Sequence, residues 1–484
     1  MTATANLPRI LMVSSEASPW AKSGGLADVV GALPAALAGL GHAVGVVIPR
    51  YMHAETAPAT RIIARLPLRL GHATYDAGVW EMISPEDGVT TYFIENAGFY
   101  GRDGLYGDRH GEFGDNHLRF ALLCKAAIEI SRLLFRADIF HCHDWQAGLV
   151  PVYLKTGAGV DPNFLHTKVV TTIHNLGYQG YMEPAKMAEI SLPGWLYRPD
   201  LLEFWGGVSL LKGGLVFSDA LTTVSRKYAE EIQTPEYGFG MDGLLRARRA
   251  SLTGILNGVD YSRWNPETDP AIPANYSAMD LRGKEICKQE LIREMGLPDA
   301  AIERPLVGIV SRFASQKGFD LIADIAGELF ADDLALIVLG NGESRYEDLF
   351  RRLAYQMPDK VALRIGYDDP MAHRIEAGSD MFLMPSHYEP CGLNQIYSLH
   401  YGTVPVVRAT GGLDDTIDDS PGTQTGFKFS DYNGRALLDT IREACAAWQD
   451  RRGWKDMMIR GMKQDFSWAA SAAEYSRLFT SLHP

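Results

Sequence analysis

Paired cysteines are missing from this chain of 484 residues. Its five cysteines are odd in number and form no Cys-x-x-Cys motif, which argues against a zinc ribbon and against a disulfide framework. Met1 to Arg9 also lack the charged and then apolar segments of a secretory signal. The sequence therefore predicts a protein of the reducing cytoplasm.

A surplus of positive charge is missing as well. The formal net charge is −13, whereas a surface that binds nucleic acid or an anionic membrane requires a basic face. We therefore expect neither nucleic acid nor a membrane as a partner. Any anionic ligand would have to be bound by a few local cations.

Long apolar runs are scarce, although residues 28–49 imitate a membrane span. Pro34 and several glycines interrupt this run, and its apolar residues change from helical spacing to a short β-branched stretch near Val44. This change of period predicts a buried helix that runs into a buried strand, rather than a transmembrane helix.

Short β-branched runs alternate with amphipathic stretches along the chain. This alternation predicts parallel sheets that are covered by helices on both faces. The expected strands are 10–13, 44–48, 91–94, 138–142, 169–173 and 220–224 in the first half, and 306–310, 335–339, 361–365, 381–384 and 404–407 in the second.

A stretch rich in Gly, Asn, Asp and Pro, residues 254–270, predicts a crossing between two domains. We expect an α/β protein with two Rossmann-like, doubly wound domains that face each other across a central cleft. The expected domains are 1–255 and 256–464, and a C-terminal helix within 465–484 is expected to pack back on the first domain. In such sheets, ligands bind beyond the carboxyl ends of the strands, so residues that follow strands are the candidates for a site.

The segment Lys22-Ser23-Gly24-Gly25 precedes the first expected helix. Paired glycines let backbone N–H groups approach a phosphate at a helix N-terminus, and Lys22 adds a full positive charge. An ordinary glycine-rich turn with a solvated lysine explains the same residues equally well. The segment matches neither the dinucleotide-binding fingerprint nor the Walker A motif, which argues against an ordinary dehydrogenase or NTPase.

Histidines gather at the ends of two further strands. His141 and His143 lie on one face of their strand, Asp144 follows them, and His174 follows the strand 169–173. Metal ligands, structural packing and a polar rim that binds a sugar all remain open as interpretations. Because no second cluster of ligands is present, we expect no metal here.

Two cations follow the expected strand 306–310. Arg312 and Lys317 can converge on one diphosphate, the arginine through its planar fork and the lysine as a point charge, although both could simply be solvated. Further on, Glu389 could bind sugar hydroxyls, and Thr410-Gly411-Gly412 forms a turn suited to a phosphate or a ribose. No two aspartates in the chain are separated by one residue, so the pair that often holds a metal-bridged diphosphate is missing. We therefore expect protein cations to neutralise a leaving diphosphate, without a metal or another cofactor.

These segments together resemble the bacterial glycogen synthases and the plant starch synthases. The resemblance extends in order over nearly the whole chain and rests on Lys22-Ser-Gly-Gly-Leu-Ala-Asp-Val-Val-Gly-Ala-Leu-Pro34, His143-Asp-Trp145, Thr172-Ile-His-Asn175, Thr223-Val-Ser225, Asn257-Gly-Val-Asp260, Trp264-Asn-Pro266, Ser311 to Gly318, Glu389-Pro-Cys-Gly-Leu393 and Thr410-Gly-Gly-Leu413. It implies a GT-B fold and the transfer of glucose from a nucleotide sugar, usually ADP-glucose, to the non-reducing end of an α-1,4-glucan. It also implies retention of configuration and no requirement for a metal.

The resemblance further implies roles for individual residues. Lys22, Arg312 and Lys317 would bind the donor phosphates. His174 would stabilise positive character at C1 of the transferred glucose, and Glu389 would hold the glucose hydroxyls. The remaining expected site residues are Gly24, Gly25, Asp28, Asp144, Asn257, Cys391, Gly392, Leu393, Thr410, Gly411 and Gly412 on the donor, and Tyr106 and Asp144 on the acceptor.

The sequence departs from the family pattern in three places. Gln146 stands where bacterial members often carry histidine, and the acceptor-side segment 99–108 lacks its usual proline. Tyr397 occupies the position of a second glutamate found in many retaining enzymes of this fold. A UDP-glucose donor, a sugar-nucleotide epimerase and a non-catalytic glucan-binding protein remain the alternatives.

Overall fold

The computed structural model describes residues 7–157 and 161–483. They form two compact units, each with its own central sheet and apolar core. The first unit contains the chain through Val224, then Ala229–Gly258, and the C-terminal segment from Trp468 onward. The second contains Ser225–Tyr228 and Val259–Ser467.

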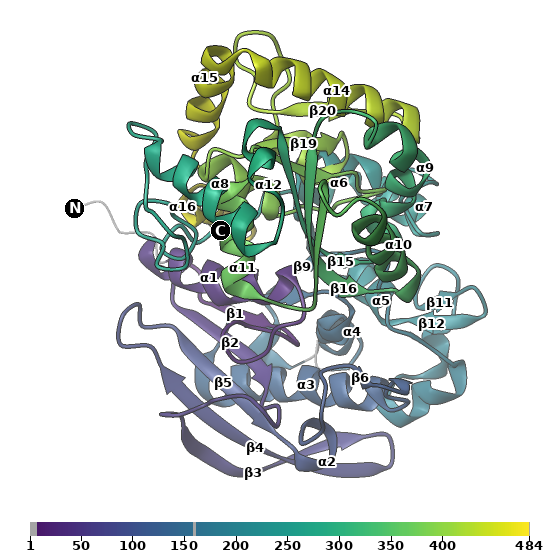
Figure 1. The fold of residues 1–484 in the computed structure, drawn as a ribbon. Coiled ribbons are helices and arrows are strands. Elements are labelled where there is room, and N and C mark those ends of the chain that lie inside the picture. The colour runs from purple at the N-terminus through teal and green to yellow at the C-terminus, as the bar shows by residue number, and fades with distance from the viewer. Residues whose placement is uncertain (1–6, 158–160, 484) are drawn as a thin grey trace. The chain divides into compact units, whose positions relative to one another are not determined.

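The first unit is built on a nine-stranded sheet with the order β14-β13-β9-β8-β1-β2-β5-β4-β3 (Figure 1). The strands from β14 to β5 are parallel, and β4 and β3 extend the sheet as an antiparallel hairpin. Since β1 reads Ile-Leu-Met-Val and is buried throughout, both faces of the sheet need a cover of helices. The strands are β1 (Ile10–Val13), β2 (Val44–Pro49), β3 (Thr60–Leu70), β4 (Ala73–Ile83), β5 (Thr90–Glu95), β8 (Ile139–His143), β9 (Lys168–Ile173), β13 (Ala220–Thr223) and β14 (Leu252–Gly254).

Helix α1 illustrates how the cover forms. It begins directly after Gly24 and buries Val29, Val30 and Leu33, and it continues through Pro34. The last helix, α16, packs against α1 and places the Phe479 ring 5.4 Å from that of His141. The helices of this unit are α1 (Gly25–Gly39), α2 (Ala97–Tyr100), α3 (Asn116–Ile130), α4 (Leu149–Thr156), α5 (Leu210–Phe217), α7 (Asp242–Ala247) and α16 (Trp468–Leu482), and α6 (Arg226–Glu231) lies where the division between the units falls.

The first unit also contains two small sheets, a π-helical turn and several 3-10 turns. Five short strands form a three-stranded and a two-stranded sheet: β10 (Tyr181–Met182), β11 (Glu203–Phe204) and β12 (Gly207–Ser209), and β6 (Gly107–Asp108) with β7 (Gly111–Glu112). A π-helical turn, Ser131–Phe135, ends α3. The 3-10 turns are Trp145–Ala147, Pro162–Phe164, Pro184–Ile190, Gly194–Leu196 and Arg249–Ser251.

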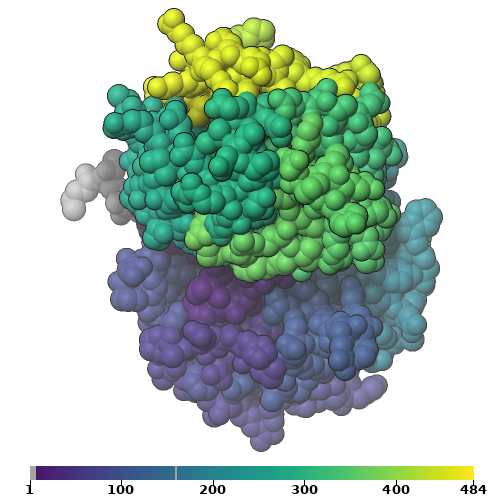
Figure 2. Space-filling model, viewed as in Figure 1, coloured from purple at the N-terminus to yellow at the C-terminus, as the bar shows by residue number. Residues whose placement is uncertain are grey.

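The second unit is built on a six-stranded parallel sheet with the order β17-β16-β15-β18-β19-β20. Helices α14 and α15 form one outer edge of this unit, which Figure 2 shows in yellow. Its strands are β15 (Leu306–Phe313), β16 (Ala335–Gly342), β17 (Val361–Ile365), β18 (Met381–Met384), β19 (Val404–Arg408) and β20 (Phe427–Phe429). Its helices are α8 (Arg282–Glu294), α9 (Phe319–Leu329), α10 (Ser344–Gln356), α11 (Asp369–Gly378), α12 (Asn394–His400), α13 (Gly411–Thr416), α14 (Gly434–Gln449) and α15 (Arg451–Met462), with 3-10 turns at Asp299–Glu303 and Ser315–Lys317.

The strands expected from the sequence are confirmed as β1, β2, β5, β8, β9 and β13 in the first unit and as β15 to β19 in the second. Residues 28–49 are confirmed as a helix that runs into a buried strand. Two strands extend well beyond the expected ends: the strand expected over 306–310 continues to Phe313, and the one expected over 335–339 continues to Gly342. Both are longer because Ser311, Arg312 and Phe313 of β15 remain paired with residues 340–342 of β16. Among residues 7–157 and 161–483, no helix combines the length and apolar character that a membrane crossing requires.

Candidate functional site

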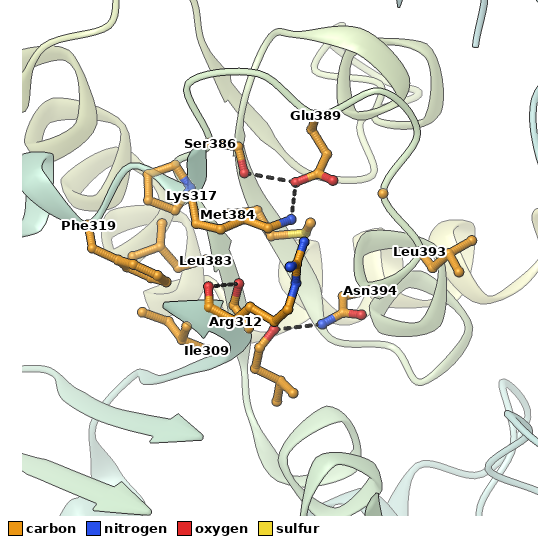
Figure 3. Close-up of a pocket in the computed structure, with 14 residues that line it drawn as sticks. Ile309, Arg312, Lys317, Phe319, Leu383, Met384, Ser386, Glu389, Leu393 and Asn394 are labelled. Carbon is orange, nitrogen blue, oxygen red and sulfur yellow. Dashed lines mark hydrogen bonds and ion pairs between the residues drawn. The ribbon is translucent and has the colours of Figure 1, made fainter. Parts of the chain in front are cut away.

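In the second unit, a cavity of about 170 Å³ opens where β15 and β18 end (Figure 3). Five of the residues singled out by the sequence lie along its wall: Arg312, Lys317, Glu389, Gly392 and Leu393. The remaining lining residues are Ile309, Val310, Ser311, Phe319, Leu383, Met384, Pro385, Ser386 and Asn394. The fold therefore gathers two cations and one carboxylate, drawn from three segments of the chain, around one hollow.

Glu389 is the buried anion of this cavity. The Lys317 Nζ atom lies 2.6 Å from Glu389 Oε2, and the Ser386 hydroxyl donates to the same oxygen over 3.0 Å (Figure 3). The other oxygen, Oε1, accepts no hydrogen bond from any described residue. One face of the carboxylate is thus fixed by the protein, while the other can accept hydrogen bonds from a ligand.

Arg312 is the exposed cation of the cavity. Its backbone belongs to β15 and pairs with Asn341 of β16, so the base of the side chain is held by the sheet. Within the described part of the chain, its guanidinium has neither an ion pair nor a hydrogen bond. A guanidinium without a protein partner at the rim of a cavity is suited to bind an anion through two parallel hydrogen bonds.

The glycine turn at the start of α13 supports the Glu389 loop. A Cβ atom on Gly412 would lie 2.0 Å from the Cys391 carbonyl oxygen, and one on Gly411 would lie 1.9 Å from that of Glu389. The N–H of Gly412 donates to the Glu389 carbonyl over 3.1 Å, so this N–H stabilises the loop that contains Glu389. Thr410 is the N-cap residue of α13 and is buried. Only glycine at positions 411 and 412 lets α13 pack this closely against the loop from Glu389 to Cys391.

The first unit carries the Lys22-Ser23-Gly24-Gly25 loop. Lys22 Nζ lies 2.7 Å from Asp28 Oδ1, so two predicted donor residues pair with each other. A Cβ atom on Gly24 or Gly25 would meet nothing within 4 Å, and neither glycine has a positive φ. The fold of this unit therefore does not itself require glycine at these two positions.

A chain of buried histidines runs from β8 to the end of β9. His143 Nδ1 lies 2.9 Å from His174 Nε2, and His141 Nε2 lies 2.6 Å from the Thr172 hydroxyl. Burial lowers the pKa of His141 and of His174 to about 3 and that of His143 well below its usual value, so all three rings are neutral near pH 7.

The hydrogen bonds of this chain assign a tautomer to His174. His143 Nε2 is buried and has no partner among the described residues. Because a buried N–H without a partner is rarer than a buried lone pair without one, we assign the proton of His143 to Nδ1. His143 then donates to His174 Nε2, and His174 carries its own proton on Nδ1. His174 can therefore offer an N–H donor to a ligand.

Asp144 lies directly after β8 in an unusual backbone conformation. Its φ of 55° with ψ of −166° falls in a region that is populated almost solely by glycine and costs about 1–3 kcal/mol for other residues. Its carboxylate accepts the backbone N–H of His174 over 2.7 Å, and burial raises its pKa to about 7. The geometry assigns Asp144 to holding the His174 backbone, while its predicted contact with a sugar stays a prediction.

Two further predicted residues stand apart from these groups. The Tyr106 hydroxyl, predicted to contact the acceptor, hydrogen-bonds Glu16 and the Ser15 hydroxyl. Asn257 lies after β14, and its buried Oδ1 atom has no partner among the described residues.

Glu16 and Ser386 belong to the site regions but were not among the predicted functional residues. Both stand just beyond the carboxyl end of a strand, namely β1 and β18. This position is the signal that could have identified them. Within 7–157 and 161–483, no three His, Cys, Asp or Glu side chains are arranged to hold a metal ion.

Known proteins resemble this chain along its length. The family model of the starch synthase catalytic domain matches residues 9–247, and that of glycosyl transferases group 1 matches residues 298–457. The solved catalytic domain of starch synthase IV from Arabidopsis thaliana, bound to ADP and acarbose, has a TM-score of 0.89 and 32% identity over 98% of this chain and 99% of its own. Sucrose-phosphate synthase from Thermosynechococcus elongatus shares the fold with a TM-score of 0.61 and 18% identity, over 98% of this chain and 99% of its own.

The fold and these matches define a glycosyltransferase of the GT-B class, with two Rossmann-like units. The glycogen synthase of Koribacter versatilis (strain Ellin345) is 51% identical over 478 residues, which is 97% of either chain. That of Anaeromyxobacter sp. (strain Fw109-5) is 49% identical over 477 residues, 98% of this chain and 99% of its own. The chain belongs to the glycogen synthase family.

Proposed function

We propose that this chain transfers glucose from ADP-glucose to the non-reducing end of an α-1,4-glucan, with retention of configuration and without a metal or another cofactor. The observation that carries the proposal is the cavity of the second unit, where the ammonium of Lys317 lies beside the carboxylate of Glu389 and the guanidinium of Arg312 has no partner among the described residues. The similarity to a starch synthase structure that contains ADP supports the choice of nucleotide. None of the five cysteines, all of which lie in the described part of the chain, forms a disulfide, and this supports a reducing, cytoplasmic setting.

In this proposal, Arg312 and Lys317 stabilise the leaving diphosphate. Negative charge develops on the phosphate oxygen as its bond to C1 of glucose breaks. Donors that are already oriented toward that oxygen stabilise the transition state more than the ground state. Lys22 is proposed to bind donor phosphate as well, which requires that it leaves or shares its ion pair with Asp28.

The sugar is proposed to be held by Glu389 and His174. The Oε1 atom of Glu389, which has no hydrogen-bond partner among the described residues, accepts hydrogen bonds from glucose hydroxyls, and the neutral His174 ring donates its Nδ1–H to a hydroxyl of the transferred glucose. The acceptor 4-hydroxyl attacks C1 from the face that the diphosphate leaves. Its proton passes to the departing phosphate oxygen, and the products are ADP and a glucan one residue longer.

The test is the incorporation of labelled glucose into glycogen from ADP-glucose and, in a parallel reaction, from UDP-glucose, each with and without EDTA. The proposal expects transfer from ADP-glucose that EDTA does not change. Preferred transfer from UDP-glucose would correct the donor. Release of an altered free sugar without any need for glycogen would identify an epimerase, and glycogen binding without transfer would identify a binding protein.

A further inference from the structure

Glu16 is a buried carboxylate just after the end of β1. It is 3% exposed and forms no ion pair with a described residue. The Ser14 hydroxyl donates to its carbonyl oxygen over 2.7 Å and accepts its N–H over 3.1 Å, which fixes its backbone. A carboxylate buried without a cation is costly unless hydrogen bonds replace its lost water. The donors that surround it are therefore important.

Two of these donors come from Ser23. The Ser23 hydroxyl donates to Glu16 Oε1 over 2.7 Å, and the Ser23 N–H donates to Oε2 over 2.5 Å. Ser23 lies between Lys22 and Gly24, and neither Gly24 nor Gly25 has a neighbour on its Cβ side. The conformation of the Lys22–Gly25 loop thus depends on hydrogen bonds to Glu16 and on the Lys22–Asp28 ion pair, rather than on apolar packing.

The third donor comes from the loop that contains Tyr106. The Tyr106 hydroxyl donates to Glu16 Oε1, the oxygen that also accepts from the Ser23 hydroxyl. Helix α3 holds this loop from behind: the Asn116 amide donates to the Tyr106 carbonyl over 2.8 Å, and Arg119 donates to the Leu105 carbonyl over 2.9 Å. Two loops that are far apart in the sequence therefore meet at one carboxylate.

We propose that Glu16 is a positioning residue that couples the Lys22–Gly25 loop to the Tyr106 loop, so that the state of one loop changes the ligand affinity of the other. This inference rests on the proposed function, in which the first loop binds the donor nucleotide and the second contacts the glucan. Glu16 contacts neither substrate in this account. Coupling between two binding sites is reciprocal, so a change made on the glucan side must appear in nucleotide affinity.

Tyr106→Phe is the most direct variant, because it removes one hydroxyl and leaves the ring in contact with Phe120. The variant is expected to raise the Kd for ADP, measured by calorimetry without glucan, by about tenfold, the loss that one hydrogen bond to a charged group explains. Tyr100→Phe is the matched control. It also removes a hydroxyl from the Arg119 region, here one that donates to the Arg119 carbonyl, but it does not touch Glu16 and should leave the Kd within twofold.

A double-mutant cycle supplies the second arm. Glu16→Gln should weaken ADP binding at least as much as Tyr106→Phe, and the two changes combined should cost no more than Glu16→Gln alone, because they remove the same interaction. The inference is overturned if Tyr106→Phe changes only the KM for glucan. It is also overturned if the double variant raises the Kd for ADP by the product of the two single factors. If the native chain binds ADP but transfers no glucose, the proposed function fails, and the coupling is still decided by the calorimetry of these variants.

Discussion

Glycine occurs in both predicted donor loops for opposite reasons. Gly25 has open space where a Cβ would stand, whereas a Cβ on Gly412 would collide with the Cys391 carbonyl. If Gly25 is required, the requirement must come from the ligand. The requirement at Gly412 comes from the fold.

Gly25→Ala and Gly412→Ala should therefore behave differently. Gly25→Ala is expected to leave the melting temperature unchanged or slightly higher, since alanine favours a helix more than glycine does. It should nevertheless lower kcat/KM for ADP-glucose, because the methyl group blocks the close approach of a phosphate. Gly412→Ala should lower both the melting temperature and kcat/KM. Thermal unfolding and steady-state kinetics of both variants check this, and a destabilised but fully active Gly25→Ala would contradict it.

Asp144 links protonation to stability. Burial raises the pKa of Asp144 to about 7 in the folded chain, whereas the pKa of an aspartate in the unfolded chain is about 4. As the pH rises, the carboxyl group therefore ionises in the unfolded chain before it ionises in the folded chain. The stability that the neutral carboxyl contributes is thus fully present below pH 4 and is lost as the pH rises toward 7. Asp144→Asn removes this titration. We expect the native chain to lose stability relative to Asp144→Asn between pH 4 and pH 7 in denaturant unfolding, and a constant difference would count against this account.

Site residues were predictable from the sequence where they lie at or after the carboxyl end of a predicted strand. Arg312 lies at the carboxyl end of β15, and Lys317 and Glu389 follow β15 and β18. Because parallel strands end at one edge of the sheet, a shared site was expected. Hydrogen-bond partners were not predictable in this way. The donors to Glu16 lie 7 and 90 residues away along the chain, and no local pattern relates such distant positions.

Among the elements, the longer buried strands were predicted well, whereas the half-exposed β3 and β4 and the three-residue strands β14 and β20 were missed. The parallel strands read as short apolar runs because both of their faces are covered. The hairpin of β3 and β4 was missed, since most residues of β3 are exposed and its apolar signal is weak. For the same reason, the polar pair Ser311 and Arg312 concealed the last part of β15.

Helix α16 tests how far the C-terminal element stabilises the first unit. It buries Trp468, Tyr475 and Phe479, and the last two rings contact His141 on β8. Phe479→Ala should lower the free energy of unfolding by about 3–5 kcal/mol, the usual cost of deleting a buried phenylalanine. Arg477→Ala, an exposed change on the same helix, serves as the control. Equal unfolding midpoints for the two variants would show that α16 is dispensable for this unit.

At the scale of the whole molecule, the acidic composition limits how an anionic donor can be bound. With a net charge of −13, the overall field repels a nucleotide sugar, so binding must depend on a few cations at short range. Of the cations in the cavity, Lys317 is already paired with Glu389, and its removal would also leave that carboxylate without its cation. Arg312 has no described partner, so a change there affects the ligand rather than the fold.

The most direct test is kcat/KM for ADP-glucose in Arg312→Ala, with Lys455→Ala, an exposed lysine on α15, as the control. Loss of one preorganised donor to the leaving group is expected to cost about 3 kcal/mol, roughly a hundredfold in kcat/KM, with an unchanged melting temperature. The control should match the native chain. If Arg312→Ala retained kcat/KM within twofold of the native value, the stabilisation of the leaving diphosphate by this cation would be refuted.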